Sequence, residues 1–242
     1  MLLIGHRGAV ATAYPENTLA AFDRALREGA DGVEVDVRLT ADAVPVCHHD
    51  PGMRRTAGDG RYLVSMDCAE LPEVGDHPVP RLSEVLDLVG DRGRVVVELK
   101  TPHWPAGAAT STVEAVVSVL RRHRLHDVVV SSFDRPRVLQ MRHSGVAVRT
   151  ALLGRPGVPL GVVLRRATQD GHQEAHPHVA SLLARLELVT PAAQQGITVT
   201  GWTVNRPHDL VRLAEAGVHA AICDEPALAR RALDDGLLAD VG

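Results

Sequence analysis

The chain has few aromatic residues, few cysteines and no long hydrophobic run. Phe, Trp and Tyr make up only 2% of its 242 residues, so a core must be built mainly from Val, Leu, Ala and Ile. The three cysteines have no CxxC spacing, which argues against a disulfide framework or a thiolate metal site and fits a reducing compartment. No apolar run approaches the roughly 18 residues that span a bilayer, so we expect no membrane insertion.

The chain also lacks an excess of positive charge. Its formal net charge is −4 with histidine neutral, which gives no general electrostatic case for binding nucleic acid or an anionic membrane. The first apolar run begins at residue 2, so we expect no targeting peptide and a cytoplasmic location. We therefore expect a small-molecule partner. The sequence does not indicate the oligomeric state.

Apolar runs alternate with amphipathic stretches about eight times along the chain. Strands are expected at 2–5, 32–39, 94–99, 128–133, 146–153, near 176, 197–204 and 220–223. Helices are expected at 18–27, 82–89, 113–122, 136–143, 182–195, 207–216 and 226–233, with one more between 154 and 178. This order at this length predicts an α/β fold, a single (β/α)8 TIM barrel spanning 1–242. The alternative is a doubly wound open sheet, but the glycine-rich GxGxxG loop typical of that fold is missing.

Two stretches follow this alternation less clearly. A second short run at 44–48 ends in His49-Asp50, and residues 51–79 are rich in Gly, Pro and charge with little periodicity. We interpret 51–79 as a small irregular insertion after the second strand. The helix at 182–195 contains Pro191, which predicts a break there.

Polar residues collect at the predicted carboxyl ends of the strands, where a barrel of this type builds its active site. They are His6, Arg7, Glu34, Asp36, His49, Asp50, Glu98, Lys100, Ser132, Phe133, Trp202, Asn205, Cys223 and Asp224. So much polarity is costly to bury without a ligand.

Three of these residues are carboxylates that a barrel would bring together. Glu34 and Asp36 share one face of their strand because they are two residues apart, and Glu98 lies on another strand. Converging carboxylates repel, and a divalent cation would relieve that repulsion. Ligands that are all oxygen favour a hard ion, Mg²⁺ or Ca²⁺. The alternative is that the acids pair only with neighbouring cations, namely Arg7, Arg38 and Lys100.

His6 and His49 lie on separate strands at the same mouth and could act as general base and general acid near neutral pH. His48 should point to the opposite face from His49, so only one of them can serve, and we choose His49 because Asp50 follows it. Arg7 and Lys100 would form a cationic clamp suited to phosphate. Together these groups fit displacement at a phosphate ester.

Six motifs in order resemble the signature of the glycerophosphodiester phosphodiesterase family. They are His6-Arg7-Gly8, Pro15-Glu16-Asn17-Thr18, Gly32-x-Glu34-x-Asp36-Val37, Val46-x-x-His49-Asp50, Glu98-x-Lys100 and Trp202-Thr203-Val204-Asn205. The resemblance implies a TIM barrel that hydrolyses glycerophosphodiesters to glycerol 3-phosphate and an alcohol. It implies one Ca²⁺ or Mg²⁺ ion on Glu34, Asp36 and Glu98, acid–base catalysis by His6 and His49, and phosphate binding by Arg7 and Lys100.

The sequence departs from the family pattern after the last strand. The family usually has Thr-Asp-x-Pro there, whereas this chain has Cys223-Asp224-Glu225-Pro226, and Val218 and its neighbours replace a glycine-containing turn. The departure affects the expected shape of this loop, but it affects none of the expected catalytic residues.

The few aromatic residues fall mostly in loops or at strand ends, namely Tyr14, Trp104, Phe133 and Trp202. This placement predicts a ligand-contacting rim, with Phe133 and Trp202 as substrate-binding residues. The alternative is that these two side chains only plug the top of the barrel. Two other functions remain open: a phospholipase-D-like lyase that releases a cyclic phosphate, and a non-catalytic phosphodiester-binding barrel. The alcohol group of the substrate is not indicated.

Overall fold

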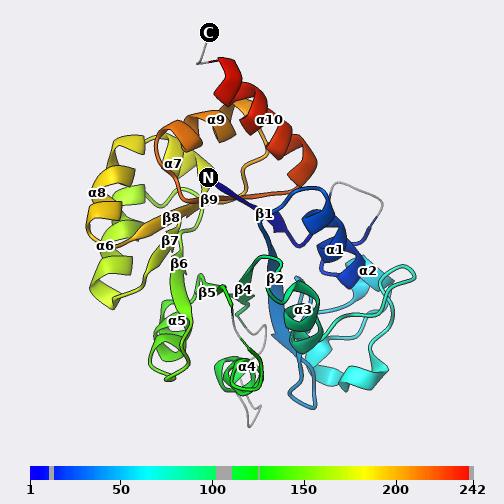
Figure 1. Ribbon diagram of the computed structural model, residues 1–242. Coiled ribbons are helices and arrows are strands. Elements are labelled where there is room, and N and C mark those ends of the chain that lie inside the picture. Colours follow the sequence, from blue (N-terminus) through cyan, green and yellow to red (C-terminus); the bar gives the residue numbers. More distant parts are fainter. Residues whose placement is uncertain (11–13, 102–110, 125, 240–242) are drawn as a thin grey trace.

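Eight parallel strands form a closed barrel in the computed structural model, which describes residues 1–10, 14–101, 111–124 and 126–239 (Figure 1). Consecutive strands pair around the barrel, and β1 pairs with both β9 and β2, which closes it. The barrel strands are β1 (Leu2–His6), β2 (Gly32–Leu39), β4 (Arg94–Leu99), β5 (Val128–Ser132), β6 (Arg149–Leu153), β7 (Glu174–His176), β8 (Thr198–Gly201) and β9 (Ala220–Cys223). The predicted TIM barrel is confirmed.

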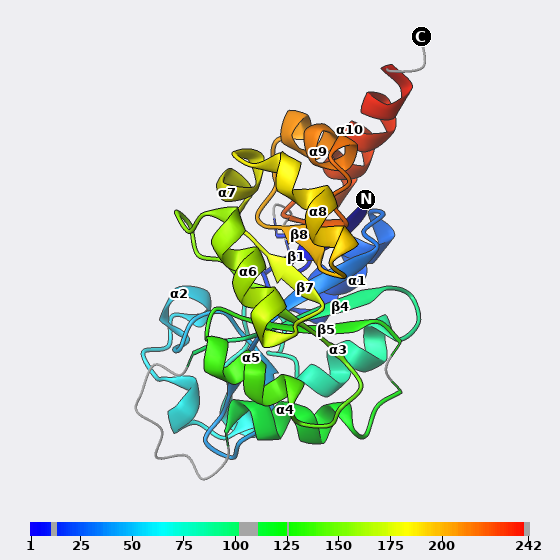
Figure 2. The same ribbon diagram turned by 90° about the vertical axis from the view of Figure 1, so that its left-hand side faces the viewer.

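Helices cover the outside of the strands, and Figure 2 shows α6, α7 and α8 in front of β7 and β8. The helices of the barrel are α1 (Leu19–Arg27), α3 (Leu82–Val89), α4 (Thr112–Leu120), α5 (Arg135–Arg142), α6 (Leu160–Asp170), α7 (Val179–Leu183), α8 (Val189–Gln194), α9 (Pro207–Glu215) and α10 (Pro226–Ala239). None of the helices in the described part of the chain is both long and apolar enough to cross a bilayer.

The alternation of β2 decides which side chains enter the barrel. Val33, Val35 and Val37 are fully buried and belong to the layer between strands and helices, together with Phe22 of α1. Because successive side chains of a strand point to opposite faces, Glu34 and Asp36 face the interior. The interior is filled by small and branched apolar residues, namely Ile4, Val96, Val129, Ala151, Ala220 and Ile222.

A buried ion pair lies across the floor of the barrel. Arg94 begins β4 and Glu174 begins β7, and these strands are not neighbours, so the 3.2 Å contact between Arg94 Nη1 and Glu174 Oε1 crosses the interior. Glu174 also accepts hydrogen bonds from His176 and Thr200. These partners outweigh burial and hold the pKa of Glu174 at about 2. The floor is therefore held by charge as well as by apolar packing.

The stretches that followed the alternation less clearly differ from the prediction in detail. The run at 44–48 forms β3 (Pro45–Cys47), which pairs antiparallel with β2 outside the barrel. Residues 51–79 contain α2 (Arg54–Ala57) and the 3₁₀ turns Leu63–Ser65 and Cys68–Glu70, packed around a small cluster of Met53, Leu63, Met66 and Val74.

Several boundaries were predicted wrongly, among them the helix expected over 226–233, which extends to Ala239. The strand expected from 146 begins only at Arg149, and the strand expected to reach 204 ends at Gly201. The helix expected over 182–195 is broken at Ala184 and Arg185, not at Pro191. Pro191 lies in the first turn of α8, where its missing N–H costs no hydrogen bond. Trp104 lies outside the described residues.

Candidate active site

Strand register brings the predicted site residues of β1, β2 and β4 to one end of the barrel. His6 is paired with Glu34 across β1 and β2, and Asp36 is paired with Glu98 across β2 and β4. Lys100 follows β4 directly. The carboxyl ends of three adjacent strands therefore supply the acids, one histidine and one cation.

The turn after β1 places Arg7 against the acids. Arg7 adopts a left-handed conformation with φ of 55°, which costs a non-glycine residue of the order of 1 kcal/mol. Its backbone N–H donates to Glu34 Oε2, and its Nε lies 3.1 Å from Asp36 Oδ2. Gly8 follows with φ of 93°, and a Cβ there would lie 2.6 Å from the backbone of Ala21. The glycine thus lets α1 approach this turn.

Asp36 is the most completely paired of the three carboxylates. Lys100 Nζ lies 2.8 Å from Asp36 Oδ1, and Asn17 Nδ2 donates to Oδ2. Asn17 also accepts from the Asp36 backbone N–H. Burial would raise the pKa of Asp36, but the charges of Lys100 and Arg7 outweigh it and hold that pKa far below its usual value. Asp36 is therefore ionised at any pH of interest.

Glu34 and Glu98 are less well compensated. Burial and the charge of Asp36 raise the pKa of Glu34 to about 8. The same two causes raise the pKa of Glu98, although Lys100 Nζ lies 2.7 Å from its Oε1. Lys100 itself is mostly buried, but the surrounding acids keep its pKa above the usual value. The site therefore has more carboxylate than its cations neutralise.

These carboxylates fit a hard divalent cation. One oxygen each of Glu34, Asp36 and Glu98 lie within 4.8 Å of one another, and all three residues are buried. The donor set is all oxygen, as Mg²⁺ and Ca²⁺ prefer. The raised pKa of Glu34 indicates that positive charge is missing at this point. The three residues could hold a metal ion.

His6 is held by a carboxylate from the other end of the chain. Its Nδ1 lies 2.7 Å from Asp224 Oδ1, just after β9, and Asn205 fixes that carboxylate by donating to Oδ2 and accepting from the Asp224 backbone N–H. Burial lowers the pKa of His6, but Asp224 and the charge of Glu34 outweigh it, so the pKa of His6 is raised. Cys223, where the family has threonine, is buried and leaves this contact intact.

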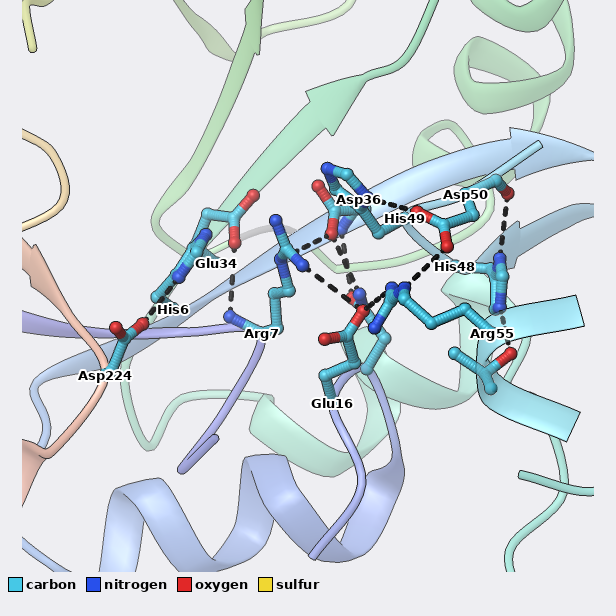
Figure 3. Close-up of polar contacts among 12 residues, drawn as sticks. His6, Arg7, Glu16, Glu34, Asp36, His48, His49, Asp50, Arg55 and Asp224 are labelled. Carbon is cyan, nitrogen blue, oxygen red and sulfur yellow. Dashed lines mark hydrogen bonds and ion pairs between the residues drawn. The ribbon is translucent and has the colours of Figure 1, made fainter. Parts of the chain in front are cut away.

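His49 and His48 point in different directions, as Figure 3 shows. His49 Nδ1 lies 2.7 Å from Asp50 Oδ1, and its ring is about one-third exposed. His48 is buried and contacts the Asp50 carbonyl and Thr56 Oγ1 instead. Burial lowers the pKa of His49 in spite of the charge of Asp36. His49 is thus the residue of this pair that faces the carboxylates.

The two histidines share one arrangement. Each presents Nδ1 to a carboxylate, so the ring carries a proton on Nδ1 and leaves Nε2 for other partners. No described residue forms a hydrogen bond with Nε2 of His6 or His49. Glu34 and Asp36 lie between the two rings in Figure 3. This is a geometry in which one ring can take a proton while the other gives one.

Phe133, just after β5, and Trp202, just after β8, contact each other at the mouth of the barrel. Their ring centroids are 5.3 Å apart in an edge-to-face arrangement. His178 packs on Trp202, and the Arg155 guanidinium lies 5.0 Å from the centre of the Phe133 ring. The Trp202 indole N–H donates to the His176 carbonyl. The two aromatic residues therefore form a wall, which is compatible both with a substrate contact and with a plug.

Several residues that complete the site have no role in the sequence-based interpretation. Asn17 enters the sequence analysis only as part of the Pro15-Glu16-Asn17-Thr18 motif, yet its side chain holds Asp36, while Thr18 caps α1. Arg55, in the insertion, donates to both Glu16 and Asp50. The sequence signal for Asn17 was its place in the Pro15-Glu16-Asn17-Thr18 motif. No local feature of the sequence indicated a role for Arg55.

Comparison with known proteins gives a consistent result. The model of the glycerophosphoryl diester phosphodiesterase family matches residues 6–228. A Mycobacterium tuberculosis protein named "Probable glycerophosphodiester phosphodiesterase 1" is 33% identical over 260 residues, which cover 97% of this chain and 93% of that protein.

Two solved structures share the fold. The glycerophosphodiester phosphodiesterase of Thermotoga maritima is 26% identical with a TM-score of 0.79, covering 96% of this chain and 97% of that one. A phosphodiesterase of Oleispira antarctica, solved with the product sn-glycerol-3-phosphate, is 24% identical with a TM-score of 0.84, covering 97% of each chain. With the family model matching nearly the whole sequence, the chain belongs to the glycerophosphoryl diester phosphodiesterase family, a family of phosphoric diester hydrolases.

Proposed function

We propose that this protein hydrolyses glycerophosphodiesters to glycerol 3-phosphate and an alcohol. The observation that carries the proposal is the pair of histidines, each with Nδ1 held by a carboxylate, on either side of Glu34 and Asp36, which form a cluster of buried carboxylates with Glu98. The family membership supports the same reaction. The product bound to the Oleispira antarctica phosphodiesterase is glycerol 3-phosphate, which fits this substrate class.

Glu34, Asp36 and Glu98 would hold one divalent cation, Mg²⁺ or Ca²⁺. Such an ion would neutralise charge on the phosphate and lower the pKa of a nearby substrate hydroxyl. Arg7 and Lys100 already lie against these acids, and we assign them to the phosphate oxygens. Phe133 and Trp202 would contact the rest of the substrate. Residues 1–242 would act as a single domain, with 51–79 as its insertion.

The two histidines have environments that favour different roles. The pKa of His49 is lowered by burial, so its ring is neutral near pH 7 and suits the general base. The pKa of His6 is raised through Asp224, so its ring suits the general acid. His49 would take the proton of the attacking hydroxyl, and His6 would protonate the departing alcohol oxygen.

The attacking group is proposed to be the substrate's own hydroxyl, next to the ester oxygen. Its oxygen would bond to phosphorus while the bond to the alcohol breaks, which gives a cyclic phosphate. Water would then open that ring with the two histidines in reversed roles. Holding a hydroxyl in line makes the attack intramolecular, which can contribute roughly 7–11 kcal/mol.

The test combines two measurements on the metal-supplemented protein. Product analysis on glycerophospho-choline, -ethanolamine, -glycerol and -inositol should give free glycerol 3-phosphate; cyclic phosphate as the final product would indicate a lyase, and no product a binding protein. An analogue without the neighbouring hydroxyl should inhibit competitively but not turn over. Rapid hydrolysis of that analogue would show direct attack by water.

We also propose a cytoplasmic location. Cys47, Cys68 and Cys223 are all free thiols, which fits a reducing compartment.

A further inference from the structure

Arg55 lies between two carboxylates that belong to different loops (Figure 3). Its Nη2 donates to Glu16 Oε1, in the loop between β1 and α1, at 2.5 Å. Its Nε donates to Asp50 Oδ2, after β3, at 2.6 Å. Each carboxylate has a second partner in the site: Glu16 accepts from Arg7 Nη1 at 3.2 Å, and Asp50 contacts His49 Nδ1 at 2.7 Å. The Arg55 guanidinium of the insertion thus contacts both carboxylates, and through them it is connected to Arg7 and His49.

We propose, on the basis of the function assigned above, that Arg55 is a positioning residue that fixes His49 through Asp50 and keeps Arg7 available to the phosphate through Glu16. Its planar guanidinium can direct separate N–H groups at two carboxylates at once. The Arg55 side chain is 50% exposed, whereas Glu16 and Asp50 are 14% and 26% exposed. Arg55 therefore acts from the surface on groups that lie deeper.

The contact with Asp50 governs proton transfer. Arg55 and His49 together hold the pKa of Asp50 at about 2, so Asp50 stays ionised near neutral pH. Without Arg55 this carboxylate would keep its charge but lose the bond that fixes its orientation. The His49 ring would then lose the alignment that proton transfer requires. We expect kcat to fall by about 10- to 100-fold.

The contact with Glu16 governs phosphate binding. Glu16 is mostly buried, and Arg55 and Arg7 together keep its pKa below the usual value in spite of burial. If Arg55 is removed, the full charge of Glu16 falls on Arg7. A more tightly paired Arg7 is less available to a phosphate oxygen, so KM should rise and the affinity for glycerol 3-phosphate should fall.

The experiment compares Arg55→Gln with Arg61→Gln and with the double variant Arg55→Gln/Glu16→Gln. Arg61 is a matched control because it lies in the same insertion, is 53% exposed and pairs only with Asp59 among the described residues. Steady-state kinetics on glycerophosphoglycerol give kcat and KM, calorimetry gives Kd for sn-glycerol 3-phosphate, and thermal melting checks the fold. Arg55→Met, which keeps the apolar stem, is made in parallel in case Arg55→Gln does not fold.

Arg55→Gln should lower kcat by about 10- to 100-fold and raise both KM and Kd by several-fold. All three constants of Arg61→Gln should stay within twofold of wild type. The double variant should bring KM and Kd back to within twofold of wild type and leave kcat low. A purely structural role would not separate the constants in this way. Equal constants for Arg55→Gln and Arg61→Gln, or a double variant with KM still raised, would overturn the proposal. An inactive wild type would instead contradict the assigned function, and Kd would still test the contact with Glu16.

Discussion

Binding of a divalent cation to the three carboxylates is expected to release a proton. Burial and Asp36 raise the pKa of Glu34 to about 8, so about nine-tenths of Glu34 is protonated at pH 7 in the metal-free protein. A carboxyl group must lose its proton before it can coordinate a metal ion. Glu34 should therefore release about 0.9 proton per ion at pH 7. Glu98, whose pKa is also raised, would add to this release.

The same reasoning gives the pH dependence of metal affinity. Below the pKa of Glu34, each pH unit costs about 1.4 kcal/mol of binding free energy, or about tenfold in affinity. Well above pH 8 the dependence on Glu34 disappears. Between pH 8 and pH 6 the affinity should fall by roughly 50-fold because Glu34 alone must give up its proton.

Isothermal calorimetry tests this directly and does not depend on activity. Mg²⁺ or Ca²⁺ is titrated at pH 7 into the protein in two buffers with different ionisation enthalpies, and the difference in heat gives the number of protons released. At pH 9 the contribution of Glu34 should fall to about 0.1 proton. Glu34→Gln should bind more weakly and lose this contribution. An affinity that stays constant from pH 6 to pH 8 would refute the reasoning, and an absence of binding would refute the metal assignment.

Other residues give three further predictions. His6→Ala and His49→Ala should each lower turnover by about 10²- to 10⁴-fold, whereas His48→Ala should lower it much less. Steady-state kinetics measure this, and a larger loss in His48→Ala would mean that the choice of His49 over His48 is wrong. Asp224→Asn removes a group that raises the pKa of His6, so the limb of the kcat/KM profile that His6 sets should move to lower pH, and an unmoved limb would contradict this assignment. Glu174→Gln removes one of the two carboxylates that pair with the buried Arg94 guanidinium, the other being Asp127, and should lower the unfolding free energy by about 1–3 kcal/mol in urea titrations at pH 7. In the wild type, the pKa of Glu174 is about 2 in the folded state against an ordinary 4.5. The ionised carboxylate therefore contributes of the order of 3 kcal/mol to the free energy of unfolding above pH 4.5, and this contribution is lost as pH falls towards 2. Equal stability of wild type and Glu174→Gln at pH 7 would contradict this role of Glu174.

The barrel was predictable because its signal is periodic and repeated. The strict alternation of Val33, Val35 and Val37 with Glu34 and Asp36 indicates both which side chains pack under the helices and which enter the barrel. Since all parallel strands end at one rim, the position of each acid at a strand end was enough to group the three carboxylates. Their proximity in the structure follows from register alone.

The partners of the two histidines were harder to predict because they depend on contacts between distant segments. Asp224 is 218 residues from His6, and Asn205 reaches it from yet another loop. Arg55 comes from an insertion without periodicity, so its contacts depend on how that insertion packs against the barrel. The boundaries of β6 and β8 were missed because β-branched residues continue beyond the hydrogen-bonded ladder.

The ion pair between Arg94 and Glu174 closes the barrel at the end opposite His6 and His49. Val96, Val129 and Ile222 pack above this ion pair. Within the described strands the interior of the barrel is therefore filled, and the site is open only at the carboxyl ends of the strands. Substrate must enter, and both products must leave, by the rim that carries Arg7 and Lys100. Glycerol 3-phosphate would therefore compete with incoming substrate for the same cations, and accumulated product would raise the apparent KM of the substrate.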